Sequence, residues 1–120
     1  MRTLPGRFEW RLPDAAANPY LATAGLVAAG LDGMERQLDP GVACTDDLFE
    51  LSLVQLRERQ IGLLPQSLGD AVDAFEADTV LRSALGETLS EQFVRLKRAE
   101  WIEYARHVSD WEVQRYATLF

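Results

Sequence analysis

The sequence has one cysteine, one histidine and no long apolar run. Cys44 alone cannot form an internal disulfide. Together with His107 it cannot supply the four ligands of a structural zinc site. The longest uncharged stretch, residues 15–31, includes Asn18, Pro19 and many small side chains, and it falls short of the roughly 20 apolar residues that a membrane span requires. These absences argue against a disulfide-stabilised domain, a zinc protein and a membrane-spanning protein.

Basic residues are also scarce. The chain of 120 residues carries 12 Lys and Arg against 19 Asp and Glu, a net charge of −7. The deficit is spread over both halves of the sequence, so nucleic acid and anionic membranes are not expected partners. Charged residues interrupt the N-terminus, and no signal-peptide pattern is visible there. With one cysteine and no targeting pattern, we expect a single domain in the cytoplasm.

Charged and apolar residues alternate from Arg7 to Leu12. Successive side chains of a strand point to opposite faces, and Pro13 cannot donate a ladder hydrogen bond. The pattern therefore predicts a strand over residues 7–12. Its apolar face holds Phe8, Trp10 and Leu12, and its charged face holds Arg7, Glu9 and Arg11.

A helix is predicted to follow, over about residues 20–37. Asn18 is a good N-cap and Pro19 suits the first helical position. The helix has no charge before Asp32, and glycine in a helix costs about 1 kcal/mol relative to alanine. We therefore expect it to be buried on most sides, with close backbone contacts at its glycines: Gly25, Gly30 and Gly33.

The rest of the chain is predicted to be helical, apart from an irregular stretch over residues 42–66 that holds a turn or two between 46 and 59. Capping patterns at Ser67, Asp78, Thr88 and Ser109 mark the helix starts. The predicted helices cover 68–77, 79–85, 88 to about 107, and 110–116. The expected fold is mostly α-helical with one short N-terminal strand.

The charged face of the strand is the strongest candidate for a functional site. Glu9 between two guanidinium groups would be held ionised and could bind Mg²⁺ or Mn²⁺. Arg7 and Arg11 could grip a phosphate or carboxylate. The alternative is an exposed edge strand whose ions pair with one another. His107 is expected to be a helix-end residue. The helical aromatic stripe, expected to serve core packing and partly an interface, comprises Phe93, Trp101, Tyr104, Trp111 and Tyr116.

Several motifs in order along the chain resemble the C-terminal part of glutamine synthetase. They are Gly6-Arg7-Phe8-Glu9-Trp10-Arg11-Leu12-Pro13-Asp14, Ala17-Asn18-Pro19-Tyr20-Leu21, Ala29-Gly30-Leu31-Asp32-Gly33, Leu64-Pro65-Gln66-Ser67-Leu68 and Ser109-Asp110-Trp111-Glu112. With Trp10 inside the strand, the motif resembles the type III-like branch of the family, which includes γ-glutamyl-amide ligases. The resemblance implies an α+β family fold, with residues 1–120 forming a C-terminal segment of its catalytic domain.

The resemblance also implies an activity and roles for three residues. Members of this family make γ-glutamyl phosphate from glutamate and ATP, and ammonia or an amine then displaces phosphate. Glu9 matches the ligand of a divalent metal, Mg²⁺ or Mn²⁺, beside the ATP phosphates. Arg11 matches a catalytic arginine that contacts glutamate and the transferring phosphoryl group. Arg7 matches an arginine on the nucleotide side.

Two departures from the family pattern limit this expectation. Phe49 stands where many bacterial members carry a tyrosine that is adenylylated, so that control is not expected. The chain is also much shorter than family members, so we expect it to be inactive alone. It would be a truncated fragment, or one part of a split synthetase that forms a homo-oligomer when complete. A non-catalytic helical binding or regulatory subunit derived from the fold is the alternative.

Overall fold

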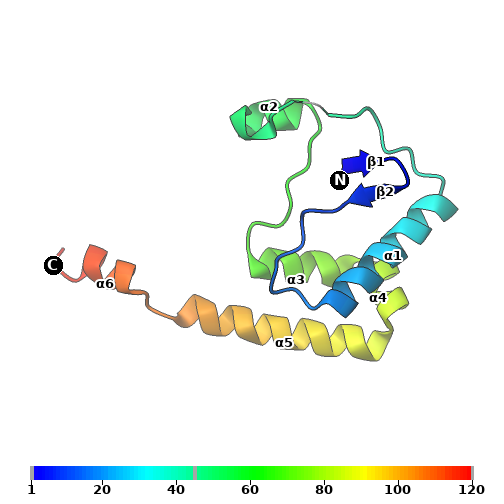
Figure 1. Cartoon of the computed structure of the whole chain (residues 1–120). Coiled ribbons are helices and arrows are strands. Elements are labelled where there is room, and N and C mark those ends of the chain that lie inside the picture. Colours follow the sequence, from blue (N-terminus) through cyan, green and yellow to red (C-terminus); the bar gives the residue numbers. More distant parts are fainter. Residues whose placement is uncertain (1, 45, 120) are drawn as a thin grey trace.

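The computed structural model describes residues 2–44 and 46–119, which are mostly helical (Figure 1). The predicted helical fold is confirmed. The elements are β1 (Arg2–Leu4), β2 (Arg7–Glu9), α1 (Pro19–Glu35), the 3₁₀ turn η1 (Leu48–Glu50), α2 (Leu53–Glu58), α3 (Leu68–Ala77), α4 (Thr79–Leu85), α5 (Glu87–Arg106) and α6 (Asp110–Tyr116).

The N-terminal strands form a two-stranded antiparallel hairpin. Gly6 lies in the turn with φ of 71°, a left-handed conformation that glycine adopts without strain. The predicted strand over residues 7–12 is too long, because β2 ends at Glu9. Arg2 is the partner of Glu9, so residues 10–12 extend past β1 and have no strand beside them.

The predicted helix starts are confirmed where a side chain caps the backbone. Asn18 Oδ1 accepts hydrogen bonds from the backbone N–H groups of Tyr20 and Leu21, at 3.0 and 3.2 Å. These bonds satisfy two of the donors that a helix N-terminus leaves open. Ser67, Asp78 and Ser109 cap α3, α4 and α6 in the same way.

At the start of α6 the cap is reciprocal. The backbone N–H and the hydroxyl of Ser109 donate to the Glu112 carboxylate at 2.8 and 2.9 Å, and the backbone N–H of Glu112 donates to the Ser109 hydroxyl at 3.3 Å. The bonds from Ser109 lower the pKa of Glu112, because they favour its ionised form.

The predicted capping box at Thr88 is wrong. Helix α5 begins at Glu87, and its N-cap is Gly86, which makes no side-chain cap bond. Gly86 has φ of 86°, which ends α4 and lets the chain turn directly into α5. Helix α5 therefore begins one residue before Thr88, so Thr88 lies inside the helix and not at its N-cap.

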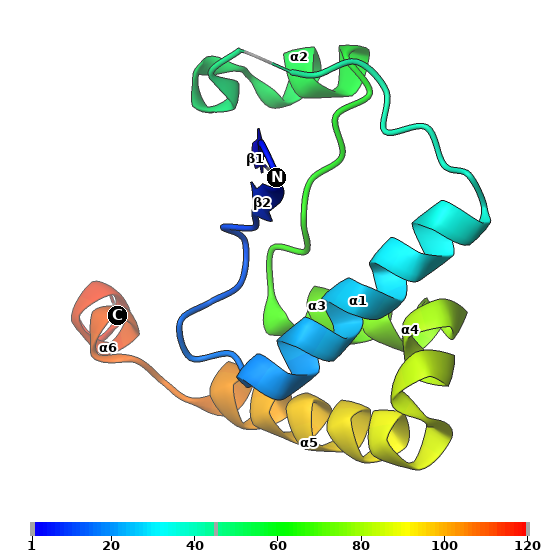
Figure 2. The same cartoon turned by 45° about the vertical axis from the view of Figure 1, so that its right-hand side comes forward.

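The helical body consists of α1, α3, α4 and α5. Helix α3 lies along α5, and α1 packs on α4 (Figure 2). Phe75 meets Phe93 edge to face with ring centroids 5.6 Å apart, and Val72 is buried. A Cβ at Gly69 would lie 2.7 Å from Nε1 of Trp101, so any larger residue there would force the Trp101 indole to shift.

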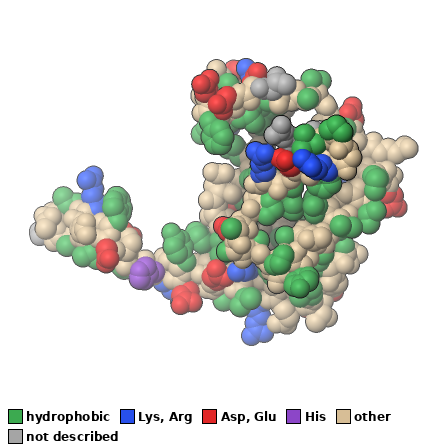
Figure 3. Space-filling view, in the orientation of Figure 1, with side chains coloured by type: hydrophobic (Ala, Val, Ile, Leu, Met, Phe, Trp, Pro, Cys, Tyr) green, Lys and Arg blue, Asp and Glu red, His purple; other side chains and the backbone are tan. Residues whose placement is uncertain are grey.

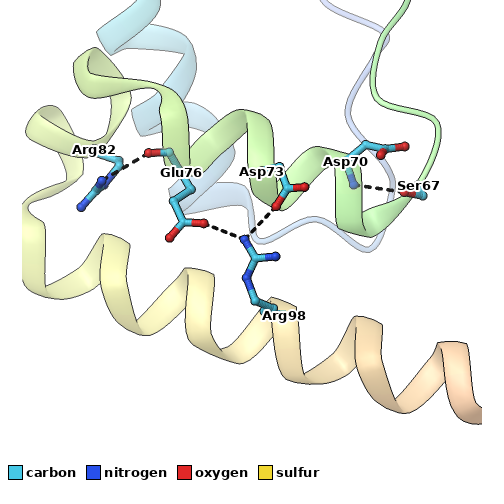
Figure 4. A network of polar contacts seen from close by, with 6 residues as sticks. All are labelled: Ser67, Asp70, Asp73, Glu76, Arg82 and Arg98. Atoms are coloured by element: carbon cyan, nitrogen blue, oxygen red, sulfur yellow. Dashed lines mark hydrogen bonds and ion pairs between the residues drawn. The ribbon is translucent and has the colours of Figure 1, made fainter.

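An ion network also fastens α5 to α3 (Figure 4). One Arg98 nitrogen, Nη2, donates to Asp73 at 2.8 Å and to Glu76 at 2.6 Å. These hydrogen bonds raise the pKa of Arg98 above its ordinary value, and the bond to Asp73 has the larger effect. Arg82 donates to the backbone oxygen of Glu76 at 3.2 Å, which ties α4 to the end of α3.

The expectation that α1 is buried on most sides is not met within this chain. No residue of α1 is buried. A Cβ at its glycines would find no atom within 4 Å, so the close backbone contacts predicted at Gly25, Gly30 and Gly33 are also absent. The helix has the composition of a buried element, but the described residues do not supply the surfaces that would cover it.

The whole chain shares this lack of cover. Its accessible surface is 10575 Å², whereas a folded monomer of 13.5 kDa has about 6,500 Å². Its radius of gyration is 18.4 Å, against about 14 Å for a compact domain of this length. Helices α2 and α6 stand away from the helical body (Figure 1). No described helix combines the length and the apolar character needed to cross a bilayer.

We predict that the isolated chain is marginally stable and self-associates. The excess surface of about 4,000 Å² is within the range that obligate protein partners bury. Large apolar side chains are exposed on it, including Val42, Phe49 and Met34. Sedimentation velocity should show concentration-dependent association, and thermal unfolding should be broad. A monodisperse monomer with a sharp cooperative melt would contradict this prediction.

Candidate functional site

The charged side chains of β2 and the residues after it gather on one side of the hairpin. Arg11 donates to Oε2 of Glu9 from Nε at 3.1 Å and from Nη2 at 2.5 Å. The side chain of Arg11 is 71% exposed and that of Glu9 is 32% exposed. Basic and acidic side chains lie beside one another at the level of the hairpin in Figure 3. The face is open to a ligand, as a functional site requires. It would be equally open if it were only an exposed strand whose ions pair with one another.

Of the two guanidinium groups expected beside Glu9, those of Arg7 and Arg11, only that of Arg11 pairs with it among the described contacts. Arg7 is exposed and forms no ion pair among the described residues. Arg7 ends the β1–β2 ladder opposite Leu4, whereas Arg11 lies past the ladder, where its side chain can fold back onto Glu9. The structure therefore brings Glu9 and Arg11 together and leaves Arg7 without a charged partner on the hairpin.

Glu9 can supply only one ligand of a metal site. Within residues 2–44 and 46–119, no three His, Cys, Asp or Glu side chains are placed to hold a metal ion. Mg²⁺ is usually held by one or two carboxylates, with waters and substrate phosphates filling its other positions. A single exposed carboxylate fits such a site as one contributor, and this chain does not form the whole site.

A cavity of about 680 Å³ lies between the segment after β2 and the helical body, and it was not predicted from the sequence. Its walls come from the segment after β2 and from α1, α3, α4 and α5. Residues lining it include Trp10, Leu21, Ala22, Gly25, Ala29, Leu85 and Phe93. The spacing of Ala22, Gly25 and Ala29 places three small residues on one face of α1. That spacing is the sequence signal from which a hollow on this face could have been found.

The remaining candidate residues lie on segments other than the charged strand. His107 is the C-cap of α5, and its backbone N–H donates to the Tyr104 carbonyl at 3.0 Å, which fits the predicted helix-end position. Cys44 is exposed. Phe49 is 100% exposed on η1.

The aromatic stripe is only partly core. Phe93 packs on Phe75, and Trp101 is half-buried and stacks on Tyr104 with centroids 5.8 Å apart. Tyr104 is largely exposed, as are Trp111 and Tyr116 on α6. The prediction of core packing is therefore correct for the first two members, while the last three contribute to surface that this chain does not cover.

Comparison with known proteins identifies a family over nearly the whole chain. A family model described as the glutamine synthetase catalytic domain matches residues 2–116. A glutamate–methylamine ligase of Methyloversatilis universalis is 53% identical over 120 residues, which is 100% of this chain and 27% of that protein. A glutamine synthetase of Halobacterium salinarum is 47% identical over 114 residues, 95% of this chain and 25% of that protein.

A glutamine synthetase of Thermus thermophilus is 39% identical over 114 residues, which is 95% of this chain and 26% of that protein. The chain thus spans about a quarter of the length of the curated relatives that it matches. The matched region includes the charged strand, the helical body and all of α6.

Proposed function

The chain belongs to the glutamine synthetase family, and on that premise we propose that residues 1–120 are the C-terminal segment of the catalytic domain of an ATP-dependent glutamate–ammonia or glutamate–amine ligase. The observation that carries the proposal is the match over residues 2–116, which includes the strand bearing Arg7, Glu9 and Arg11. The 53% identity to a glutamate–methylamine ligase makes methylamine a candidate nucleophile beside ammonia.

Each charged residue of the strand has a proposed role. Glu9 is one ligand of a Mg²⁺ or Mn²⁺ ion that, when bound, neutralises charge on the ATP phosphates. Arg11 binds glutamate and stabilises the transferring phosphoryl group, since its planar fork can form two parallel bonds to an oxyanion. Arg7, which has no ion-pair partner among the described residues, is available to the nucleotide.

The reaction makes strong electrostatic demands on these side chains. The γ-carboxylate oxygen of glutamate attacks the γ-phosphorus of ATP, the bond to ADP breaks, and γ-glutamyl phosphate forms. Ammonia or an amine then attacks the acyl carbon, and phosphate leaves with the former carboxylate oxygen. Phosphoryl transfer relies mainly on positioning and charge neutralisation, and Arg11 contributes to both by holding the anionic groups beside Glu9.

The segment needs the rest of the synthetase to work. One carboxylate and two guanidinium groups cannot hold ATP, glutamate and their metal ions. The uncovered surface, with an excess of about 4,000 Å² over a compact monomer, supports a large complementary partner. That partner is the remainder of the ligase, on the same polypeptide or on a separate one, and the complete enzyme is expected to be a homo-oligomer. Phe49 has no phenolic hydroxyl, and we propose on that ground that the enzyme is not adenylylated at this position.

Isotope transfer tests the proposed reaction in a hybrid ligase. We define the hybrid ligase as the Methyloversatilis universalis glutamate–methylamine ligase carrying this chain in place of its matching 27%. With glutamate labelled by ¹⁸O in its γ-carboxylate, ATP and methylamine or ammonia, one labelled oxygen should appear in phosphate for each amide formed. Amide formation with no label in phosphate would contradict the γ-glutamyl phosphate route.

A further inference from the structure

Trp10 occupies a position that connects the charged strand to the helical body. It lies between Glu9 and Arg11, whose side chains meet each other on one side of the backbone. An extended chain directs the intervening side chain to the other side. There the half-buried Trp10 lines the 680 Å³ cavity with residues of α1, α4 and α5.

The other apolar residues of this segment do not share that position. Phe8 is 49% exposed and Leu12 is 61% exposed, and neither lines the cavity. Trp10 is therefore the one residue of 7–12 that lines this cavity.

Few other contacts hold this part of the chain in place. The β1–β2 ladder ends at Glu9. For residues 10–13, the side-chain hydrogen bonds among the described residues are the two from Arg11 to Glu9, which join the segment only to itself. Among the described contacts, the place of Trp10 in the cavity wall is the one that links residues 7–12 to the helical body.

We propose that Trp10 is a positioning residue: as the half-buried residue of this segment in the wall of the cavity beside α1 and α5, it fixes the direction of Glu9 and Arg11. The inference rests on the proposed function, because the two side chains need a fixed direction only if they bind metal and substrate. Reacting groups must be held within about 0.5 Å of the productive geometry, and a displacement of about 1 Å can cost a hundredfold in rate. A large rigid side chain with few rotatable bonds suits this task.

The first readout is metal binding, which does not depend on turnover. Free Mn²⁺ is measured by electron paramagnetic resonance during titration of the hybrid ligase and of its Trp10→Ala and Trp10→Phe variants. We expect Trp10→Ala to weaken Mn²⁺ binding about tenfold to a hundredfold, the range found when residues that orient metal ligands are lost. Trp10→Phe should restore most of the affinity, since a phenyl ring still fills part of the cavity. Phe8→Ala is the matched control, because it removes a neighbouring ring that does not line the cavity, and it should have little effect.

The second readout is the kinetic pattern. Trp10→Ala should lower kcat and raise the Mg²⁺ concentration for half-maximal rate, while Trp10→Phe stays near the unsubstituted hybrid. If Trp10→Ala lowers only the melting temperature and leaves Mn²⁺ affinity and Mg²⁺ dependence unchanged, the positioning role is wrong. Should Trp10→Ala fail to fold, Trp10→Leu and Trp10→Phe decide, and equal Mn²⁺ affinity in all folded variants overturns the inference. An inactive unsubstituted hybrid would contradict the proposed function itself, and with it the need for positioning.

Discussion

Replacing Glu9 by Gln should reduce the turnover of the hybrid ligase about a hundredfold or more. A loss of this size is typical when an enzyme loses a group that stabilises charge in the transition state. The substitution keeps the size of the side chain and removes its negative charge, so a cation loses one anionic ligand. Glu9 is partly exposed and its described polar contacts are those from Arg11. The melting temperature should therefore change little, while the Mg²⁺ requirement shifts to higher concentration.

Arg11→Lys and His107→Gln complete the comparison. Lysine keeps the positive charge of Arg11 but cannot reproduce the planar fork that now makes two contacts with Glu9, so activity should fall as well. His107 caps α5 far along the chain from the charged strand, and its replacement should leave catalysis nearly intact. Steady-state kinetics with titrated Mg²⁺ measures all three variants. Full activity and an unchanged Mg²⁺ dependence in Glu9→Gln would mean that the charged face is ordinary surface.

The helix boundaries could be predicted from the sequence wherever the signal is local. Asn18, Ser67, Asp78 and Ser109 each bind backbone N–H groups two or three residues ahead, so the residue type and its spacing contain the needed information. Thr88 misled because the conformation of Gly86, two residues earlier, had already started the helix.

The strand and its site were predictable only in part. The alternation of residues 7–12 predicted a shared face for Glu9 and Arg11, and the two side chains do meet. The pattern could not reveal where pairing ends, because that depends on the register with β1, nor that Arg7 stays out of the ion pair. The small residues of α1 indicate a hollow on one of its faces, but how α1 lies against α4 and α5 to close the cavity depends on tertiary packing that no local pattern specifies.

The composition of α1 gave the most useful failed prediction. Its long uncharged run with three glycines predicts a buried helix, yet no residue of α1 is buried in this chain. The contradiction disappears if the covering surfaces belong to the rest of a synthetase, of which the chain spans about a quarter.

The isolated chain is expected to form no product with ATP, glutamate and ammonia or methylamine. Among the described residues it lacks a complete metal site, and its charged strand is open to solvent. Amide formation by the purified chain, dependent on both ATP and glutamate and surviving controls for host enzyme, would contradict this. The Methyloversatilis universalis ligase without its matching segment should also be inactive, because it lacks the part of the site that corresponds to Glu9 and Arg11.

The central claim is that this chain supplies the C-terminal part of a glutamate–amine ligase active site. It is tested most directly by measuring γ-glutamylamide formation in three samples: the chain alone, the relative without its matching segment, and the hybrid ligase. The account predicts ATP-dependent product from the hybrid alone, with ammonia or methylamine as nucleophile, and its loss on Glu9→Gln. A hybrid that assembles like the parent ligase but forms no amide with either nucleophile would contradict the account and favour a non-catalytic role for this segment.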